Sequence, residues 1–424
     1  MRVASPSARD RERGNDLSAL DSRVPMSPAE IEVALLTGGS DRHYTFGLAM
    51  ALISKGVHLD VVGGDGVDGP EMHATPKLNF LNLRGSQRPD ASLPRKVSRL
   101  LSYYGRLIGY AWDAKPKVFH ILWNNKFEYL DRTLVMLYYK IRGKKIVLTA
   151  HNVNQARRDK HDSLLNRLTL RIQYRLTDHI FVHTEKMKDE LHRDYGVPEQ
   201  ATTVIPFGIN NAVPNTALTS TEAKQRLGIG DSEKTILFFG NMRSSKGLEF
   251  LLAAFERIIT SDMRYRLIIA GRRMKEFQRQ WEDIQPAVSR FFEQGLVILR
   301  NEFIPDEEME LYFKAADVLV LPYTEIFQSG VLFLGYSFGL PVIATDVGSF
   351  REDIIEGRTG FLCKPCDPAD LARTIEMYFE SDLFKNLDAR RQEIQDYMSA
   401  QHSWDVVADF TRNVYGSLSE KNPL

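Results

Sequence analysis

Two basic residues, Arg243 and Lys246, lie three positions apart in the segment FFGNMRSSKGLEFLLAAF, just after an apolar run that ends at Gly240. An arginine fork and a lysine point charge at the carboxyl end of a strand suit a diphosphate. A solvated basic loop is the ordinary alternative. The position after a strand favours phosphate binding, and we expect Gly240 and Asn241 to lie beside the phosphates.

A second candidate anion site lies in the segment YTEIFQSGVLFLGYSFGLPVIATD. Ser329 can cap a helix that begins at Gly330, and the free N–H groups and the dipole of a helix start favour an anion. A cap without a ligand is the simpler alternative. We expect an anion site opposite Arg243 and Lys246, in the segment that contains Glu325, Gln328, Ser329, Gly330 and Val331.

In the first half of the chain, two apolar runs are also followed by residues that suit ligand binding. TAHNV places His151 and Asn152 after such a run, where a histidine can act as a base or bond to a sugar hydroxyl. Gly38 and Gly39 follow the first apolar run and would let the backbone approach a ligand closely. A structural histidine and a packing turn are the alternatives, and the three-glycine dinucleotide fingerprint is absent.

Apolar runs and helical stretches alternate along the chain, which predicts βαβ units and parallel sheets. Two prolines and a glycine interrupt the pattern between Ile205 and Ser220, as in an interdomain linker. The predicted parts are a disordered tail (1–28), a first Rossmann-like domain (29–210), a second one (211–400), and a C-terminal helix (401–424) that packs back on the first domain. The predicted strands are 31–37, 57–64, 117–122, 145–150, 178–184, 234–241, 265–271, 296–302, 317–323 and 340–346.

Composition excludes several classes of protein. The chain has 424 residues with 55 basic and 55 acidic side chains, so it lacks the strongly basic balance of a dedicated nucleic-acid binder. Its two cysteines, Cys363 and Cys366, exclude a disulfide scaffold, and their place near a strand end favours structural thiols over a redox pair. No apolar run reaches the length of a membrane span, and the first 27 residues lack the apolar core of a signal peptide. We therefore expect a cytoplasmic protein.

One segment, LPRKVSRLLSYYGRLIGYAWDAKPK, predicts an amphipathic helix that mixes basic and aromatic residues. Such a helix suits an anionic membrane surface, such as the inner face of the cell membrane. An ordinary helix packed on the sheet is the alternative. The residues concerned are Arg95, Lys96, Arg99, Tyr103, Tyr104, Arg106, Tyr110 and Trp112.

Together these segments resemble the group 1 glycosyltransferases, family 4, over about residues 31–418. The resemblance rests on the Gly38-Gly39 loop, TAHNV, VIPFGIN, FFGNMRSSKGLE, ADVLVLPY and GLPVIATDVGSFREDIIEGRTGFL. It implies the α/β GT-B fold, in which two doubly wound domains face each other across a cleft. It also implies transfer of a sugar from a nucleotide donor to an acceptor, with retention and without a metal or other cofactor.

The resemblance also implies roles for individual residues. Arg243 and Lys246 would bind the diphosphate of a UDP- or GDP-sugar, Gly39 would face it, and His151 would contact the sugar. Backbone amides at Ser329–Val331 would hold the distal phosphate or the sugar, and Phe303 and Ile304 would read the base. The QSGV segment is similar to that of a subset of the family. The usual second glutamate, which holds the ribose, aligns with Leu334, so the ribose contact stays unassigned.

Two alternatives stay open at this point. Another GT-B enzyme, such as a sugar phosphorylase, an epimerase or a sugar-phosphate synthase, would need an extra anion site in the first domain. Arg157 and Arg158 near His151 could provide one, and with Asn152 they are the candidates for the acceptor side. A non-catalytic GT-B partner protein is supported only by the missing second glutamate. The expected partners are a nucleotide sugar and a glycan or lipid-linked acceptor, and not a nucleic acid.

Overall fold

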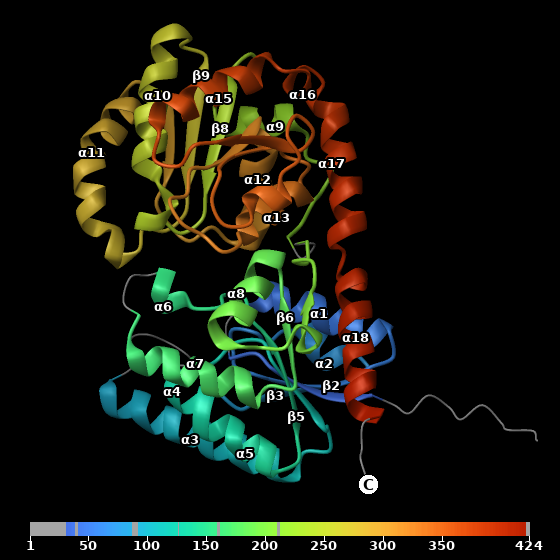
Figure 1. The fold of residues 1–424 in the computed structure, drawn as a ribbon. Coiled ribbons are helices and arrows are strands. Elements are labelled where there is room, and N and C mark those ends of the chain that lie inside the picture. Colours follow the sequence, from blue (N-terminus) through green and yellow to red (C-terminus); the bar gives the residue numbers. More distant parts are fainter. Residues whose placement is uncertain are drawn as a thin grey trace, which may run out of the picture. The chain divides into compact units, whose positions relative to one another are not determined.

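The computed structural model describes residues 31–38, 41–86, 92–125, 127–158, 162–209 and 213–420. The predicted tail at 1–28 lies outside these residues. The described strands form two sheets, and neighbouring strands are parallel throughout. The predicted fold class, two Rossmann-like α/β parts, is therefore confirmed (Figure 1).

The first sheet has the strand order β3-β2-β1-β4-β5-β6-β7. Alternate residues of β1 enter two different cores: Val33 and Leu35 one, Ala34 and Leu36 the other. Helices cover both faces, which explains why these strands read as continuous apolar runs. The strands are β1 (Glu32–Leu36), β2 (His58–Gly63), β3 (Leu78–Asn82), β4 (Val118–Ile121), β5 (Lys145–Thr149), β6 (His179–Val182) and β7 (Thr202–Val204).

β3 and β7 are absent from the predicted strands, and β13 was anticipated only through the two cysteines near a strand end. β3 has no buried residue, since all five are intermediate or exposed, and β7 has only three residues. Neither strand contains an apolar run long enough to stand out from its surroundings, because both lie at an edge of the sheet.

The second sheet has the order β10-β9-β8-β11-β12-β13 and one large core. Cys363 ends β13 and is buried, whereas Cys366 is exposed, and both thiols are free. Burial raises the pKa of the Cys363 thiol to about 12, which disfavours a reactive thiolate. The strands are β8 (Lys234–Phe239), β9 (Tyr265–Ala270), β10 (Val297–Arg300), β11 (Val318–Leu321), β12 (Val342–Thr345) and β13 (Gly360–Cys363).

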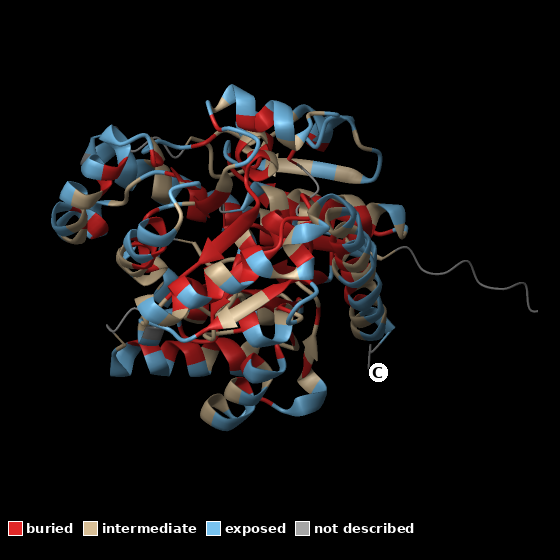
Figure 2. Cartoon of the chain, turned by 90° about the horizontal axis from the view of Figure 1, so that it is seen from above, coloured by how far each residue is buried: buried red, intermediate tan, exposed pale blue. Residues whose placement is uncertain are grey.

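Helices of the first part divide between the two faces of its sheet. Apolar residues of α3, α5, α7 and α8 share one core, whereas α1 shares the other core with α18, the last described helix. Figure 2 shows buried residues in red and exposed ones in pale blue. The helices are α1 (Arg42–Ser54), α2 (Pro70–Ala74), α3 (Leu93–Asp113), α4 (Glu128–Leu130), the π-helix η1 (Asp131–Val135), α5 (Met136–Ile141), α6 (Gln155–Arg158), α7 (Leu164–Leu176), α8 (Glu185–Tyr195) and η2 (Glu199–Ala201).

Helices of the second part alternate with its strands. No described helix in either part of the chain is long and apolar enough to cross a bilayer. The helices are α9 (Ser220–Arg226), η3 (Ser244–Lys246), α10 (Leu248–Ser261), η4 (Lys275–Phe277), α11 (Gln278–Glu293), α12 (Asp306–Ala315), α13 (Gly330–Ser337), α14 (Phe350–Asp353), α15 (Pro368–Glu380), α16 (Asp382–Lys385), α17 (Leu387–His402) and α18 (Trp404–Glu420).

The end of the chain packs on the first sheet. α17 contacts α13, and α18 contacts α1 and β4. The Trp404 ring fills the space that side chains at Gly47 and Gly208 would need, since a Cβ there would lie 2.2 Å and 2.5 Å from ring atoms. The Tyr415 hydroxyl lies 2.5 Å from Nδ1 of the buried His120 on β4. The contact expected for the C-terminal helix is present.

This packing predicts opposite effects for two helix-interior glycines. Gly47→Ala puts a methyl group into the Trp404 ring, and overpacking of this kind costs about 1–3 kcal/mol. Gly416→Ala on α18 has no neighbour nearer than 3.9 Å and should gain about 0.5–1 kcal/mol of helix propensity. Thermal unfolding of both variants measures the difference, and Gly47→Ala combined with Trp404→Ala should cost less than the two single changes added. Equal melting temperatures for the two glycine variants would contradict the packing.

Candidate functional site

The loop after β8 is shaped by close backbone contacts. Gly240 has a φ of +104°, and its carbonyl oxygen would lie 2.0 Å from a Cβ at Gly271. Asn241 is exposed, and Arg243 keeps 46% of its side chain exposed while it pairs with Glu276 at 3.5 Å. The contact with Gly271, which sequence reasoning missed, holds the loop against the end of β9.

Lys246 ends the short turn η3 beside the end of β11. Gly247 has a φ of +64°, and a Cβ there would lie 1.9 Å from the carbonyl oxygen of Pro322. The Thr324 N–H donates to the carbonyl of Ser245 at 3.0 Å. The Lys246 ammonium lies 3.8 Å from the centroid of the Tyr323 ring and donates to the Tyr323 hydroxyl.

Tyr323 connects this basic loop to the start of α13. The residue is fully buried, burial raises its pKa, and its hydroxyl also bonds with Ser329. Ser329 in turn caps α13 by accepting a hydrogen bond from the Leu332 N–H at 3.4 Å. The hydroxyl group of Tyr323 therefore links Lys246 to the start of α13. The sequence predicts that these two groups lie near one another.

The first turn of α13 leaves room at its surface. Gly330 is exposed, and a Cβ there would meet only Phe207, at 3.9 Å. Val331 is half-buried and lies against Gly240. Both polar atoms of the Gln328 side-chain amide are buried without a protein partner, so a ligand group or water must satisfy them.

The remaining residues of the second part differ in exposure. Glu325 is exposed and borders a cavity of about 580 Å³ together with Thr324 and Asp346. After β10, the Phe303 ring is 65% exposed, whereas Ile304 is buried. Leu334 is buried in the core, so its position cannot supply a ribose contact.

In the first part, a tight turn follows β1. Gly38 has a φ of +59°, and a Cβ there would lie 2.6 Å from the carbonyl oxygen of Trp123. Only glycine fits so close to another strand end with this conformation. Gly39 lies outside the described residues, so the structure says nothing of its predicted contact.

His151 directly follows β5 in an aromatic environment. Its ring stacks on Trp123 with centroids 4.4 Å apart and meets the edge of Tyr44 at 4.7 Å. Its Nδ1 lies 3.1 Å from Nε2 of His183. Burial lowers the pKa of His151 well below its usual value, so the imidazole is neutral at pH 7. Sequence reasoning missed these three neighbours, although Trp123 and His183 also follow strands closely.

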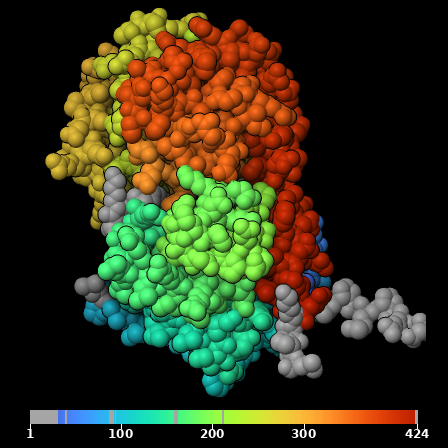
Figure 3. Space-filling model, viewed as in Figure 1, coloured from blue at the N-terminus to red at the C-terminus, as the bar shows by residue number. Residues whose placement is uncertain are grey.

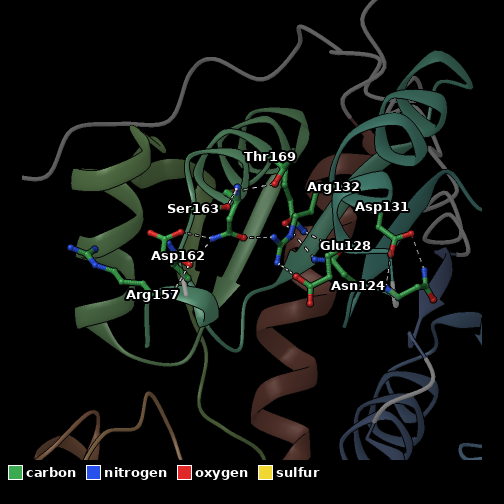
Figure 4. A network of polar contacts seen from close by, with 12 residues as sticks. Asn124, Glu128, Asp131, Arg132, Arg157, Asp162, Ser163 and Thr169 are labelled. Carbon is green, nitrogen blue, oxygen red and sulfur yellow. Dashed lines mark hydrogen bonds and ion pairs between the residues drawn. The ribbon is translucent and has the colours of Figure 1, made fainter. Parts of the chain in front are cut away.

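A cavity of about 230 Å³ lies beside His151 and includes Asn152 in its wall. Arg132, on the π-helix η1, is buried there; it donates to Oδ1 of Asn166 at 2.8 Å and pairs with Glu128 (Figure 4). π-helical turns often occur at functional sites. The other lining residues include Leu122, Trp123, Asn124, Leu148, Val153, Gln155, Leu170, Gln173 and Tyr174.

The predicted acceptor residues on α6 have a different setting. Arg157 pairs with Asp194 at 2.8 Å and with Glu190 at 3.6 Å, both on α8. The side chain of Arg158 lies outside the described part of the chain. Of the two described side chains, that of Asn152 lines the cavity and that of Arg157 does not.

Comparison with solved structures shows the same fold in other proteins. Sucrose-phosphate synthase from Thermosynechococcus elongatus matches with a TM-score of 0.73 and 19% identity, over 93% of this chain and all of that one. Anabaena HepE, solved in complex with UDP, matches with a TM-score of 0.71 and 16% identity, over 91% of this chain and all of that one.

Curated relatives match at modest identity. This chain spans about half the length of several of them, such as the D-inositol 3-phosphate glycosyltransferase of Streptomyces bingchenggensis. That protein is 28% identical over 244 residues, which are 56% of this chain and 52% of the relative. The protein of the same name from Corynebacterium diphtheriae is 23% identical over 394 residues, 89% of each chain.

Two family models match successive parts of the chain. Residues 37–213 match the model described as Glycosyltransferase Family 4, and residues 233–381 match the one described as Glycosyl transferases group 1. The two matches cover every described strand except β1, and they include the loops that carry the candidate site. The predicted resemblance is confirmed, and the chain belongs to the group 1, family 4 glycosyltransferases.

Proposed function

We propose that this protein transfers a sugar from a nucleotide-sugar donor to a glycan or lipid-linked acceptor, in the synthesis of a polysaccharide or glycoconjugate. The observation that carries the proposal is the Lys246–Tyr323–Ser329 connection, which brings a cation and the N-terminus of α13 to one place. Arg243 adds a second, half-exposed cation on the same loop. Together these groups suit a diphosphate.

The proposed reaction retains the configuration of the sugar. The bond from the anomeric carbon to the diphosphate oxygen breaks, and a bond from that carbon to the acceptor oxygen forms on the same face. The departing diphosphate takes the acceptor's proton, so the protein need not supply a carboxylate base. Arg243 and Lys246 act by stabilising the charge that develops on the diphosphate.

For the donor we propose a UDP- or GDP-sugar, bound without a further cofactor. The exposed Phe303 ring would stack on the base beside Ile304. The unpaired Gln328 amide and the N–H groups at Ser329–Val331 would face the distal phosphate or the sugar. Glu325 and His151 would contact sugar hydroxyls, and Gly240 and Asn241 would lie along the diphosphate.

For the acceptor we propose a neutral, hydroxyl-rich ring in the 230 Å³ cavity. The charges of Arg132 and Glu128 offset each other, and the amides of Asn124, Asn152 and Gln173 can both donate and accept hydrogen bonds. The volume lies below the ~300 Å³ of small drug-sized sites, which suits a single sugar or cyclitol ring.

We further propose that four helices of the first part, α3, η1, α5 and α7, dock on an anionic membrane. Most of the exposed large apolar side chains of the described residues lie on α3, η1, α5 and α7, among them Leu101, Trp112 and Ile141. These helices lie side by side, since Tyr138 donates to the Ile108 carbonyl and α5 contacts α7; α3 and α5 are the cyan and teal surface in Figure 3. No acidic residue occurs in 93–112, 136–141 or 164–176, whereas Arg95, Lys96, Arg99 and Arg106 do, which suits anionic lipid.

The alternative of a phosphorylase or another enzyme of sugar phosphates has less support. It needs an extra anion site in the first part, and Arg157 is held by two carboxylates of α8. The alternative of a non-catalytic partner rested on the missing glutamate at Leu334 and does not explain an intact basic loop.

Lys246→Ala should reduce transfer about 100- to 1,000-fold, because one preorganised charge in the transition state is worth about 2–4 kcal/mol. The protein should stay folded, since Lys246 is only half-buried and lies on the short turn η3, which has no buried residue. Nucleotide release from UDP-glucose or GDP-mannose, measured beside Lys275→Ala as an exposed-lysine control, tests this. Turnover within threefold of the unaltered protein would refute the role.

Gly330→Val should leave a folded protein, because a Cβ at this position meets only Phe207 at ordinary contact distance. It should weaken binding of UDP or GDP far more than binding of uridine or guanosine, which have no phosphate to meet the added side chain. Calorimetry with each pair measures this, and Gly109→Val on α3, where a Cβ meets nothing, is the control. An equal loss for both ligands, or none, would mean that Ser329 only caps a helix.

Replacing Arg95, Lys96 and Arg99 by Glu should abolish salt-sensitive binding to liposomes that contain anionic lipid, because each basic residue near the surface contributes about 1 kcal/mol. The matched control places Glu at Arg272, Lys275 and Arg279, which changes the charge equally in the second part. Co-sedimentation at low and high salt measures the effect. If the two triple variants bind alike, the helices serve only the fold.

A further inference from the structure

Two histidine rings and one backbone carbonyl group form a row of hydrogen bonds across three neighbouring strand ends of the first sheet. Nδ1 of His183, just after β6, lies 3.3 Å from the carbonyl oxygen of Ile205, just after β7. Nε2 of the same ring lies 3.1 Å from Nδ1 of His151, just after β5. The strand order β5-β6-β7 brings the three groups into line.

The carbonyl group at one end fixes which atom donates in each of these hydrogen bonds. A carbonyl oxygen only accepts, so Nδ1 of His183 carries a proton and donates it to Ile205. In a neutral ring Nε2 is then a bare acceptor, and it can bond only to a protonated Nδ1 of His151. His151 therefore carries its one proton on Nδ1 and leaves Nε2 with a lone pair.

Both rings stay neutral because the surroundings are apolar. His183 is 6% exposed, and Phe207 packs against its ring at 5.1 Å. Trp123 and Tyr44 enclose His151. Burial lowers the pKa of His183 to about 4, and that of His151 is also lowered. Nε2 of His151 has no protein partner, so the only polar atom of this ring left for a ligand is an acceptor.

We infer that His183 is a positioning residue: with the Ile205 carbonyl it fixes the tautomer of His151, so that Nε2 accepts a hydrogen bond from a hydroxyl of the donor sugar. The inference rests on the proposed function for the identity of the ligand, but the tautomer itself does not. Under this assignment His151 cannot protonate a leaving group, because Nε2 has no proton and the ring does not gain one near pH 7.

The first test is the tautomer of the unaltered protein, read from ¹⁵N chemical shifts and N–H couplings of histidine-labelled protein at pH 7–8. His151 should show a protonated Nδ1 and a pyridine-type Nε2, and so should His183. A protonated Nε2 on His151 would overturn the inference, whatever the protein transfers.

The second test removes the hydrogen-bond acceptor that residue 183 provides. His183→Leu removes it, so His151 should become a mixture of tautomers, one of which has a protonated Nε2. The rate of sugar transfer from UDP-glucose or GDP-mannose, or of hydrolysis of these donors, should fall about tenfold, as for one lost hydrogen bond. His183→Gln keeps an oxygen acceptor and should restore both the shift pattern and most of the rate. Affinity for UDP or GDP should not change in either variant.

A matched control separates positioning from loss of a buried ring. His179→Leu removes another histidine of the same strand, whose Nε2 bonds to Thr203 and not to His151. This variant should leave the His151 spectrum and the rate unchanged. If His183→Leu keeps the wild-type rate, or if His183→Gln fails to restore the spectrum, the positioning role is wrong. If no nucleotide sugar reacts at all, the proposed function fails, and the spectra still decide the tautomer.

Discussion

The loop that carries the two cations can reach the end of β11 only because residue 247 has no side chain. A Cβ there would overlap the Pro322 carbonyl, and the same exclusion holds between Gly271 and Gly240. The first contact brings η3 against the end of β11, so that Lys246 meets Tyr323, and the second holds the loop against the end of β9. The shape of the candidate site around Lys246 thus depends on the absence of two side chains more than on the charges.

The two halves of the candidate site use opposite electrostatics. Around Lys246 the chain gathers a cation, a helix N-terminus and an unpaired amide, which suit a charged diphosphate. Around His151 it gathers aromatic rings and neutral imidazoles, where an added charge would be costly. A sugar with many hydroxyls and no charge fits the second environment, so the division matches the two ends of a nucleotide sugar.

Much of this arrangement could be predicted from sequence. Every predicted strand is present, because strands covered on both faces read as apolar runs. The residues that follow these strands lie at the carboxyl edge of each sheet, as parallel strands require. Tyr323, Gly271, Trp123 and His183 escaped prediction because their roles come from contacts between segments far apart in sequence. Arg132 escaped because it lies on a π-turn within a helix and follows no strand. The roles of individual residues came mainly from the family resemblance.

The packing of Trp404 has a consequence for biosynthesis. The core shared by α1 and α18 stays incomplete until the last helix has been made, although the first sheet ends with β7, some 200 residues earlier. At ~5–20 residues per second, translation of the intervening chain takes about 10–40 s. During that time the apolar face of α1, including Leu48 and Leu52, lacks its cover on the nascent chain. The first part therefore cannot complete its packing while the second part is still being made.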